Sequence, residues 1–195
     1  MKSVRSLLDP FDRTNDPDAV VHRRTRTAKD EITSPWPQWL SAELIEIFQG
    51  LGIQQPWLHQ AQAANLIHDG HHTIVSTGTA SGKSMAYLMP CLEQLLRAKD
   101  SGFNDADAGA SVLYICPTKA LAADQLSAVE ALKVPGVRAA PYDGDTDQAT
   151  RTWVRQHANF VFTNPDMLHR GILPNHPAWS RFFKRLRYII IDEAH

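Results

Sequence analysis

The chain has 195 residues, of which 43% are hydrophobic, and this size and composition suit one domain with a buried core. Its formal net charge is −1, so no overall positive field attracts polyanions, and any contact with nucleic acid has to come from locally placed groups. Both cysteines lie in apolar stretches, which favours buried thiols in a reducing compartment over a disulfide. The sequence indicates neither a signal peptide nor a membrane span, and we expect a cytoplasmic protein.

Residues 1–38 are polar and interrupted by prolines, and they predict a loosely ordered N-terminal arm. Two tryptophans in the segment 35–39 offer large rings that can dock this arm. A first helix is predicted around residues 44–51, where apolar residues recur at helical spacing. A second helix is predicted to begin at Pro56, because a proline fits the first turn, and to end at Gly70. We place the domain itself at residues 39–195.

From residue 73 onward, short apolar strands alternate with amphipathic helices. The predicted strands are 73–76, 112–116, 137–140, 160–162 and 188–192, and the predicted helices are 84–97, 118–132 and 147–157. This alternation predicts an α/β fold with a parallel sheet that helices cover on both faces. Ligands of such sheets bind at the carboxyl ends of the strands, and each polar cluster singled out below directly follows a predicted strand.

Residues 76–84, S-T-G-T-A-S-G-K-S, link a predicted strand to a predicted helix. A tight loop at this point turns backbone N–H groups toward one centre, and the helix N-terminus adds partial positive charge, so the segment predicts a phosphate-binding loop. Lys83 is placed to reach the β- and γ-phosphates, and Ser84 can offer its hydroxyl to Mg²⁺. The strict pattern has glycine where this chain has Thr77, and a G-K-S triplet also occurs in ordinary turns. The candidate phosphate-binding residues are Thr79, Ala80, Ser81, Gly82, Lys83 and Ser84.

Asp192 and Glu193 follow the apolar run 188–191 and form the second candidate half of this site. Asp192 can hold Mg²⁺ through its water shell, and Glu193 can orient and deprotonate an attacking water. Solvated acids also end strands in many α/β proteins, so the assignment depends on the pairing with the loop. The two halves together predict ATP and Mg²⁺ as cofactors, with Lys83 and Glu193 as catalytic residues.

The motifs resemble, in order and spacing, those of superfamily 2 DEAD/DEAH-box helicases. The resemblance covers roughly residues 40–195, and its four segments are similar to motifs I, Ia, Ib and II of the first RecA-like domain. These segments are 76–84, 117–122 (P-T-K-A-L-A), 163–168 (T-N-P-D-M-L) and 192–195 (D-E-A-H). The wording of the first segment, together with Y-D-G-D-T at 142–146, is closer to the bacterial mitomycin-repair helicase group and its fungal relatives.

This resemblance implies a P-loop NTPase of RecA-like fold that translocates on nucleic acid, with DNA and 3′-to-5′ travel implied as well. It implies that Gln60 reads adenine, since an amide donates and accepts at once, whereas a surface glutamine on a helix is the alternative. His195 matches the residue that couples the ATP site to the nucleic-acid side.

The resemblance also implies that the chain ends at motif II, before the second RecA-like domain and its arginines. Little ATPase activity and no unwinding are therefore expected of residues 1–195 alone. In this fold class, a strand that comes after the D-E-A-H segment usually lies between the strands 73–76 and 188–192. Without it, those two strands are expected to lack a shared neighbour.

Four residues that follow predicted strands are the candidate contacts to nucleic acid: Thr118, Lys119, Thr163 and Asn164. Small hydroxyls, an amide and one lysine suit phosphate oxygens better than base edges, so the predicted binding is independent of sequence and weakened by salt. Helix capping by the threonines and the asparagine is the alternative, and both roles can hold together.

Two other classes of function stay open. A different P-loop enzyme, such as a small-molecule kinase, would need an acceptor pocket and a lid, and no basic lid segment follows residue 98. A non-catalytic nucleotide-binding module would bind nucleotide without turnover. Stimulation of ATP turnover by nucleic acid distinguishes the helicase from both.

Overall fold

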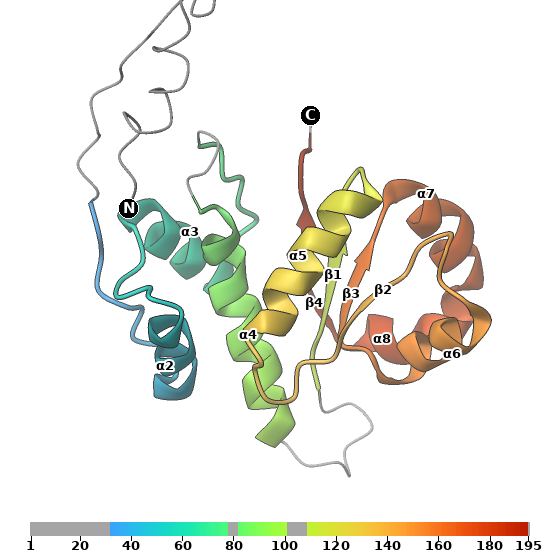
Figure 1. Ribbon diagram of the computed structural model, residues 1–195, viewed down its shortest axis with the longest axis horizontal. Coiled ribbons are helices and arrows are strands. Elements are labelled where there is room, and N and C mark those ends of the chain that lie inside the picture. The colour runs from blue at the N-terminus through green and yellow to red at the C-terminus, as the bar shows by residue number, and fades with distance from the viewer. Residues whose placement is uncertain (1–31, 78–81, 101–108, 195) are drawn as a thin grey trace, which may run out of the picture. The chain divides into compact units, whose positions relative to one another are not determined.

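The computed structural model of the protein describes residues 32–77, 82–100 and 109–194. These residues contain one four-stranded sheet with the order β2-β3-β1-β4, and all its pairings are parallel (Figure 1). The strands are β1 (Ser111–Ile115), β2 (Ala139–Pro141), β3 (Phe160–Thr163) and β4 (Leu186–Ile191). The predicted parallel α/β fold is therefore confirmed, with strand ends that differ from the prediction by one or two residues.

Helices flank and connect these strands, as the alternating pattern predicted. They are α2 (Ala42–Gly50), α3 (Leu58–His68), α4 (Ser84–Asp100), α5 (Lys119–Ala131), α6 (Gln148–His157), α7 (Pro165–Met167) and α8 (Ser180–Lys184). Between α7 and α8 the chain forms a π-helical turn at Leu168–Ile172 and a 3₁₀ segment at Leu173–Trp179, where three prolines between 165 and 177 obscure the helical spacing. Within the described ranges, no helix is both long and apolar enough to cross a membrane.

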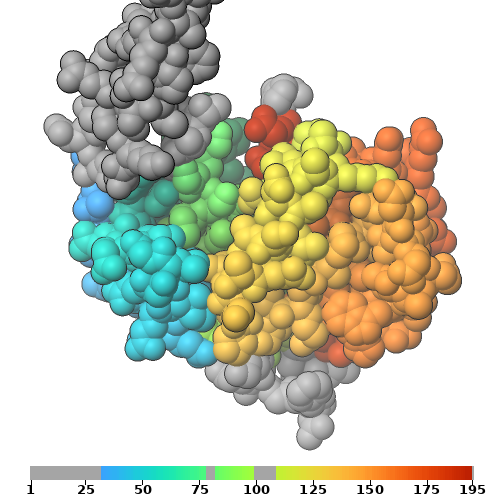
Figure 2. All heavy atoms as spheres, viewed as in Figure 1, coloured from blue at the N-terminus to red at the C-terminus, as the bar shows by residue number. Residues whose placement is uncertain are grey.

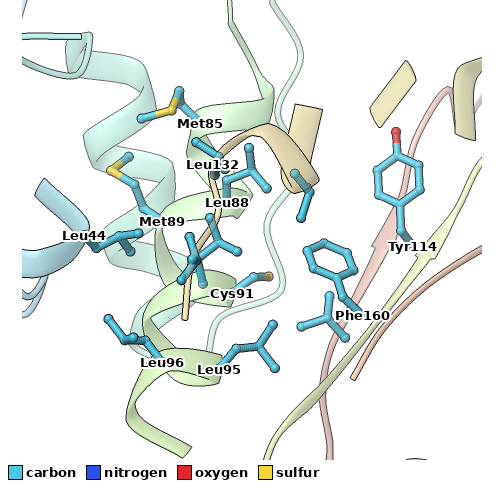
Figure 3. Packing of buried hydrophobic residues seen from close by; sticks show 14 of the residues in the cluster. Leu44, Met85, Leu88, Met89, Cys91, Leu95, Leu96, Tyr114, Leu132 and Phe160 are labelled. Atoms are coloured by element: carbon cyan, nitrogen blue, oxygen red, sulfur yellow. The ribbon is translucent and has the colours of Figure 1, made fainter. Parts of the chain in front are cut away.

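Successive side chains of β1 and β3 point into two different apolar clusters, one on each face of the sheet. Tyr114 and Phe162 lie in the first cluster, which the long α4 dominates (Figure 3). Leu113 and Val161 lie in the second cluster with Trp179 and with side chains of α6 and α8. Both clusters are closed to water, and their burial supplies the main stabilisation of the sheet.

The strand β4 is covered on one face only. Tyr188 and Ile190 pack against the first cluster, whereas Ile189 and Ile191 are 56% and 63% exposed. The predicted strand 73–76 does not form, and Ile74 in its middle is 95% exposed. A strand needs a neighbour for its backbone hydrogen bonds, and none of the described residues supplies a strand between this segment and β4. The prediction of a strand at 73–76 is therefore wrong for this structure.

The compact unit begins at Ile32 and not at residue 39. Thr33 forms an antiparallel bridge with Trp57, and the Trp36 ring stacks on Phe48 with 5.7 Å between centroids. The indole N–H of Trp36 donates to the carbonyl of Gln54 at 3.0 Å. Residues 32–38, which the sequence predicted as part of the arm, thus pack on the domain through the predicted tryptophan anchor.

A buried carboxylate holds α2 against α4. Glu93 in α4 is 2% exposed and accepts hydrogen bonds from the backbone N–H of Ser41 (2.9 Å), from its hydroxyl (2.8 Å) and from Arg97 Nε (2.6 Å). The Ser41 hydroxyl also caps the N-terminus of α2. The position of α2 is therefore tied to the helix that begins at the phosphate loop.

Candidate nucleotide and nucleic-acid site

The candidate site residues gather at one edge of the sheet. Figure 1 shows the N-terminal ends of α4 and α5, the short α7 and the C-terminal end of β4 at this edge. In Figure 2, the red end of β4 lies between the green residues of α4 and the yellow residues of α5. Strands that all run the same way bring the segments after them to one side, which is why residues distant in sequence converge here. Thr79, Ala80, Ser81 and His195 lie outside the described residues.

The end of the candidate phosphate-binding loop is hydrogen-bonded to α3. Gly82 has φ +63°, a left-handed conformation that glycine adopts without steric cost, and its carbonyl accepts from Gln60 Nε2 at 2.9 Å. Gln60 is only 5% exposed, and its Oε1 accepts the backbone N–H of Trp57 at 2.9 Å. Lys83 Nζ donates to the carbonyl of Thr77 at 3.3 Å, so the lysine folds back over its own loop. The amide that the resemblance assigned to adenine therefore also anchors the loop to α3.

Ser84 is the first residue of α4, and its hydroxyl points toward α5. Both the Ser84 hydroxyl and the Tyr87 hydroxyl donate to Gln125 Oε1, at 3.3 Å and 2.9 Å. Burial raises the pKa of Tyr87 to about 12. Ser84 lowers this pKa, and the negative charge of Asp192 raises it. Tyr87 thus stays a neutral donor at physiological pH.

Asp192 directly continues β4, and both of its carboxylate oxygens have partners in the chain. Its backbone N–H donates to the carbonyl of Ile115 at 2.9 Å, which places it beside the end of β1. Its Oδ2 accepts the hydroxyl of Tyr114 at 2.5 Å, and its Oδ1 accepts the backbone N–H of Glu193 at 3.0 Å. Glu193 has φ +52°, so the chain turns sharply out of the strand at this residue and leaves Glu193 exposed.

Tyr87 and Tyr114 connect the two halves of the site. Their ring centroids lie 6.0 Å apart, Tyr87 shares the acceptor Gln125 with Ser84, and Tyr114 donates to Asp192. Burial, reinforced by Tyr87 and Asp192, raises the pKa of Tyr114, so its hydroxyl keeps the proton that it donates. The sequence reasoning missed Tyr87, Tyr114 and Gln125. The sequence does hint at Tyr114, because a tyrosine stands in the apolar strand β1, and a buried phenol hydroxyl usually has a hydrogen-bond partner.

The oxygen atoms of Ser84 and Asp192 suit a hard cation such as Mg²⁺. Across residues 32–77, 82–100 and 109–194, no group of three or more His, Cys, Asp or Glu side chains could hold a metal by itself. A cation at this edge would take its remaining ligands from phosphates and water, which is the usual arrangement for Mg²⁺ bound with a nucleotide.

Three of the four candidate nucleic-acid contacts lie at the same edge with solvent access. Thr118 is exposed and caps α5 through the N–H of Leu121 (3.3 Å), and the partly exposed Asn164 caps α7 through the N–H of Met167 (2.8 Å). Lys119 Nζ lies 2.5 Å from Asp145 Oδ2 in an exposed ion pair. This pair, chiefly its hydrogen bond, raises the pKa of Lys119. The alternative of helix capping therefore holds for Thr118 and Asn164, and it leaves phosphate contact open.

Thr163 does not fit the predicted contact through its side chain. It is 2% exposed, and its hydroxyl donates to the carbonyl of Tyr142 at 2.7 Å. The side chain lies on the face of β3 that packs in the second cluster with Val161, because strand residues two apart share a face. A hydroxyl buried in this way cannot reach a phosphate, so we remove Thr163 from the candidate interface.

The loop that carries Asp145 is held by Arg151 of α6. The guanidinium donates to the carbonyls of Thr146 (2.8 Å) and Asp143 (3.0 Å), and it lies over the Tyr142 ring at 5.5 Å from the centroid. Asp143 Oδ1 also accepts the backbone N–H of Asp145 at 2.8 Å. These contacts define the backbone of the loop, and so they keep Asp145 beside Lys119.

Comparison with known proteins places these motifs among helicases. The model of the DEAD/DEAH box helicase family matches residues 57–195. The ATP-dependent helicase HRQ1 of Saccharomyces cerevisiae is 40% identical over 77% of this chain and 14% of its own length. The uncharacterized ATP-dependent helicase YprA of Bacillus subtilis is 35% identical over 90% of this chain and 23% of its own length. The crystal structure of the DUF1998 helicase MrfA bound to DNA and AMPPNP has a TM-score of 0.74 and 34% identity, over 84% of this chain and 22% of that one. The chain thus spans less than a quarter of the length of each of these relatives.

Proposed function

Because this chain belongs to the DEAD/DEAH box helicase family, we propose that it forms the ATP-binding part of an ATP-dependent helicase that translocates on nucleic acid. The observation that carries the proposal is a chain of contacts between Ser84, from the phosphate loop, and Asp192, from the end of β4. Ser84 and the partly buried Tyr87 share the acceptor Gln125, the Tyr87 ring packs on that of Tyr114, and the buried Tyr114 donates to Asp192. This chain of contacts supports a single site formed by the nucleotide half and the acidic half of the sequence.

Each side chain at this edge has a proposed role. Lys83 neutralises the β- and γ-phosphates, and backbone N–H groups of residues 79–82 surround them. Ser84 and Asp192 hold Mg²⁺, which, when bound, offsets the negative charge that develops on the transferred phosphoryl group. Glu193 orients and deprotonates the attacking water.

Gln60 is proposed to bind adenine while it holds Gly82, and His195 is proposed to couple the ATP site to nucleic acid. Arginines from a second RecA-like domain are proposed to complete the site. The two buried free thiols, Cys91 and Cys116, support a reducing, cytoplasmic environment.

We propose DNA as the nucleic acid, supported by the DNA in the related MrfA structure. Thr118, Lys119 and Asn164 contact its phosphates at the N-terminal ends of α5 and α7, where helix dipoles also favour negative charge for the longer α5. Such contacts are independent of base sequence, and they agree with a chain whose formal net charge is only −1.

A binding titration tests this function directly. We expect the purified chain to bind a fluorescent ATP analogue more tightly with Mg²⁺ than with EDTA, and we expect single-stranded DNA to change that affinity. A small phosphate acceptor in place of DNA should have no effect. Nucleotide binding that responds to the small acceptor and ignores DNA would favour the kinase alternative. Nucleotide binding that responds to neither would favour the non-catalytic module.

The ion pair between Lys119 and Asp145 predicts that substitutions of its two partners change the affinity for DNA in opposite directions. Lys119→Ala should weaken binding of single-stranded DNA and lower the slope of log K against log salt by about 0.7, because one phosphate contact is lost. Asp145→Asn should strengthen DNA binding about two- to fivefold, since a phosphate no longer competes with the carboxylate for the ammonium group. Fluorescence anisotropy at several salt concentrations measures both.

The control for Asp145→Asn is Asp166→Asn, which makes the same change in net charge at an exposed position of α7. An equal gain in affinity from both variants would mean that general charge, and not release of Lys119, explains the effect.

A further inference from the structure

Tyr114 combines a packing role with a polar one. Its ring is fully buried between Tyr87 and Phe162, at 6.0 Å and 5.0 Å between centroids. Figure 3 shows the ring at the margin of the first cluster, with its hydroxyl pointing away from the apolar side chains of α4. A phenylalanine would fill the same space, so the packing alone does not require the hydroxyl.

The hydroxyl of Tyr114 reaches the carboxylate that is proposed to hold Mg²⁺. It donates to Asp192 Oδ2, while the backbone N–H of Glu193 donates to Asp192 Oδ1. Two donors on different oxygens restrict the rotation of the Asp192 carboxylate. Without them, a carboxylate at the end of a strand would rotate freely in solvent. The donor from Glu193 depends on a backbone turn at an exposed position, whereas the donor from Tyr114 comes from the buried core.

The other proposed Mg²⁺ ligand is oriented from the same side. The Ser84 hydroxyl donates to Gln125 Oε1, and that acceptor is held by the Tyr87 hydroxyl at 2.9 Å. Tyr87 packs against Tyr114, so one aromatic pair supports both oxygen ligands. The two proposed ligands, Ser84 and Asp192, lie far apart in the sequence. The tyrosine pair connects them, because Tyr87 shares an acceptor with Ser84 and Tyr114 donates to Asp192.

We propose that Tyr114, assisted by Tyr87, is a positioning residue that orients Asp192 and Ser84 before Mg²⁺·ATP binds and thereby sets how strongly Mg²⁺ tightens nucleotide binding. This inference rests on the proposed function. Ligands that are already oriented lose less freedom on binding, and substitutions of the groups that hold metal ligands typically weaken metal binding about 10- to 100-fold.

The test is Tyr114→Phe in the full chain, with titration of a fluorescent ATP analogue at graded Mg²⁺ concentrations and in EDTA. We expect the Mg²⁺ concentration for half of the effect to rise about tenfold, while the affinity in EDTA stays at the wild-type value. Tyr87→Phe should shift the Mg²⁺ dependence in the same direction and by less, because it acts through Gln125. Thermal melting reports separately on folding.

The matched control is Tyr188→Phe, which removes a phenol from the same face of the sheet in β4, at a residue that packs on the first cluster. It should leave the Mg²⁺ dependence unchanged. An unchanged Mg²⁺ dependence in Tyr114→Phe, or an equal loss of affinity with and without Mg²⁺, would overturn the positioning role alone. A wild-type chain whose nucleotide binding ignores Mg²⁺ would overturn the proposed function and this inference together.

Discussion

Replacement of Lys83 by alanine is expected to weaken binding of an ATP analogue about 10- to 100-fold. The ammonium group at the start of α4 donates to the loop carbonyl of Thr77, and from there it can turn to a phosphate. A hydrogen bond to a charged group contributes about 1.5–3 kcal/mol, which corresponds to this range of affinity. Anisotropy titration at fixed Mg²⁺ and fixed salt measures the change.

Lys184→Ala is the control for loss of one positive charge. Lys184 ends α8 just before β4 begins, so it lies at the opposite end of that strand from Asp192, and it is exposed. This variant should bind nucleotide like the wild type. Unchanged affinity in Lys83→Ala, with wild-type melting, would remove the loop at 76–84 from the nucleotide site and with it the whole proposed function.

Gly82→Ala is expected to lower the melting temperature by about 2–10 °C and to weaken nucleotide binding as well. A side chain at φ +63° costs roughly 1–2 kcal/mol, and an added Cβ would lie 2.6 Å from Gln60 Nε2. Either Gln60 or the loop has to move, which breaks the hydrogen bond that fastens the loop to α3. For a chain of this length, each kcal/mol shifts melting by about 2–4 °C.

Gly50→Ala provides the comparison, because an added Cβ at the end of α2 meets no atom within 4 Å and the backbone there is helical. It should melt at or slightly above the wild-type temperature. The double variant Gln60→Ala with Gly82→Ala removes the close contact and keeps the backbone strain, so it should show less destabilisation than the sum of the two single variants. Wild-type melting of Gly82→Ala would contradict the described contact between the loop and α3.

The sequence predicted those parts of the fold that depend on local periodicity. The apolar runs of β1 and β3 and the helical spacing of α5 and α6 are local patterns, and their elements form within one or two residues of the predicted bounds. The cap of α5 by Thr118 is a short-range signal of the same kind, and capping was one of the two roles that the sequence left open for this residue. The family also followed from the sequence, because its motifs keep a constant order and spacing.

Features that depend on long-range pairing were not predictable in the same way. Whether residues 73–76 form a strand depends on a neighbouring strand that can accept and donate their backbone hydrogen bonds. The apolar residues of the segment do not show whether such a strand is present. The contact between Tyr114 and Asp192 depends on the register that pairs Ile115 with Ile191, which periodicity alone does not define. The burial of Thr163 follows from a local pattern, because Thr163 shares a strand face with the buried Val161.

The helix α5 carries residues of both candidate sites, the one for nucleic acid and the one for nucleotide. Its first turn carries Thr118 and Lys119, and Gln125, about two turns further on, accepts from Ser84 and Tyr87. If DNA binds at the first turn as proposed, a displacement of that turn along the helix axis would be passed to Gln125 and so to its hydrogen bond with Ser84. Thermodynamic reciprocity would then make any change that DNA causes in nucleotide affinity equal, as a factor, to the change that nucleotide causes in DNA affinity.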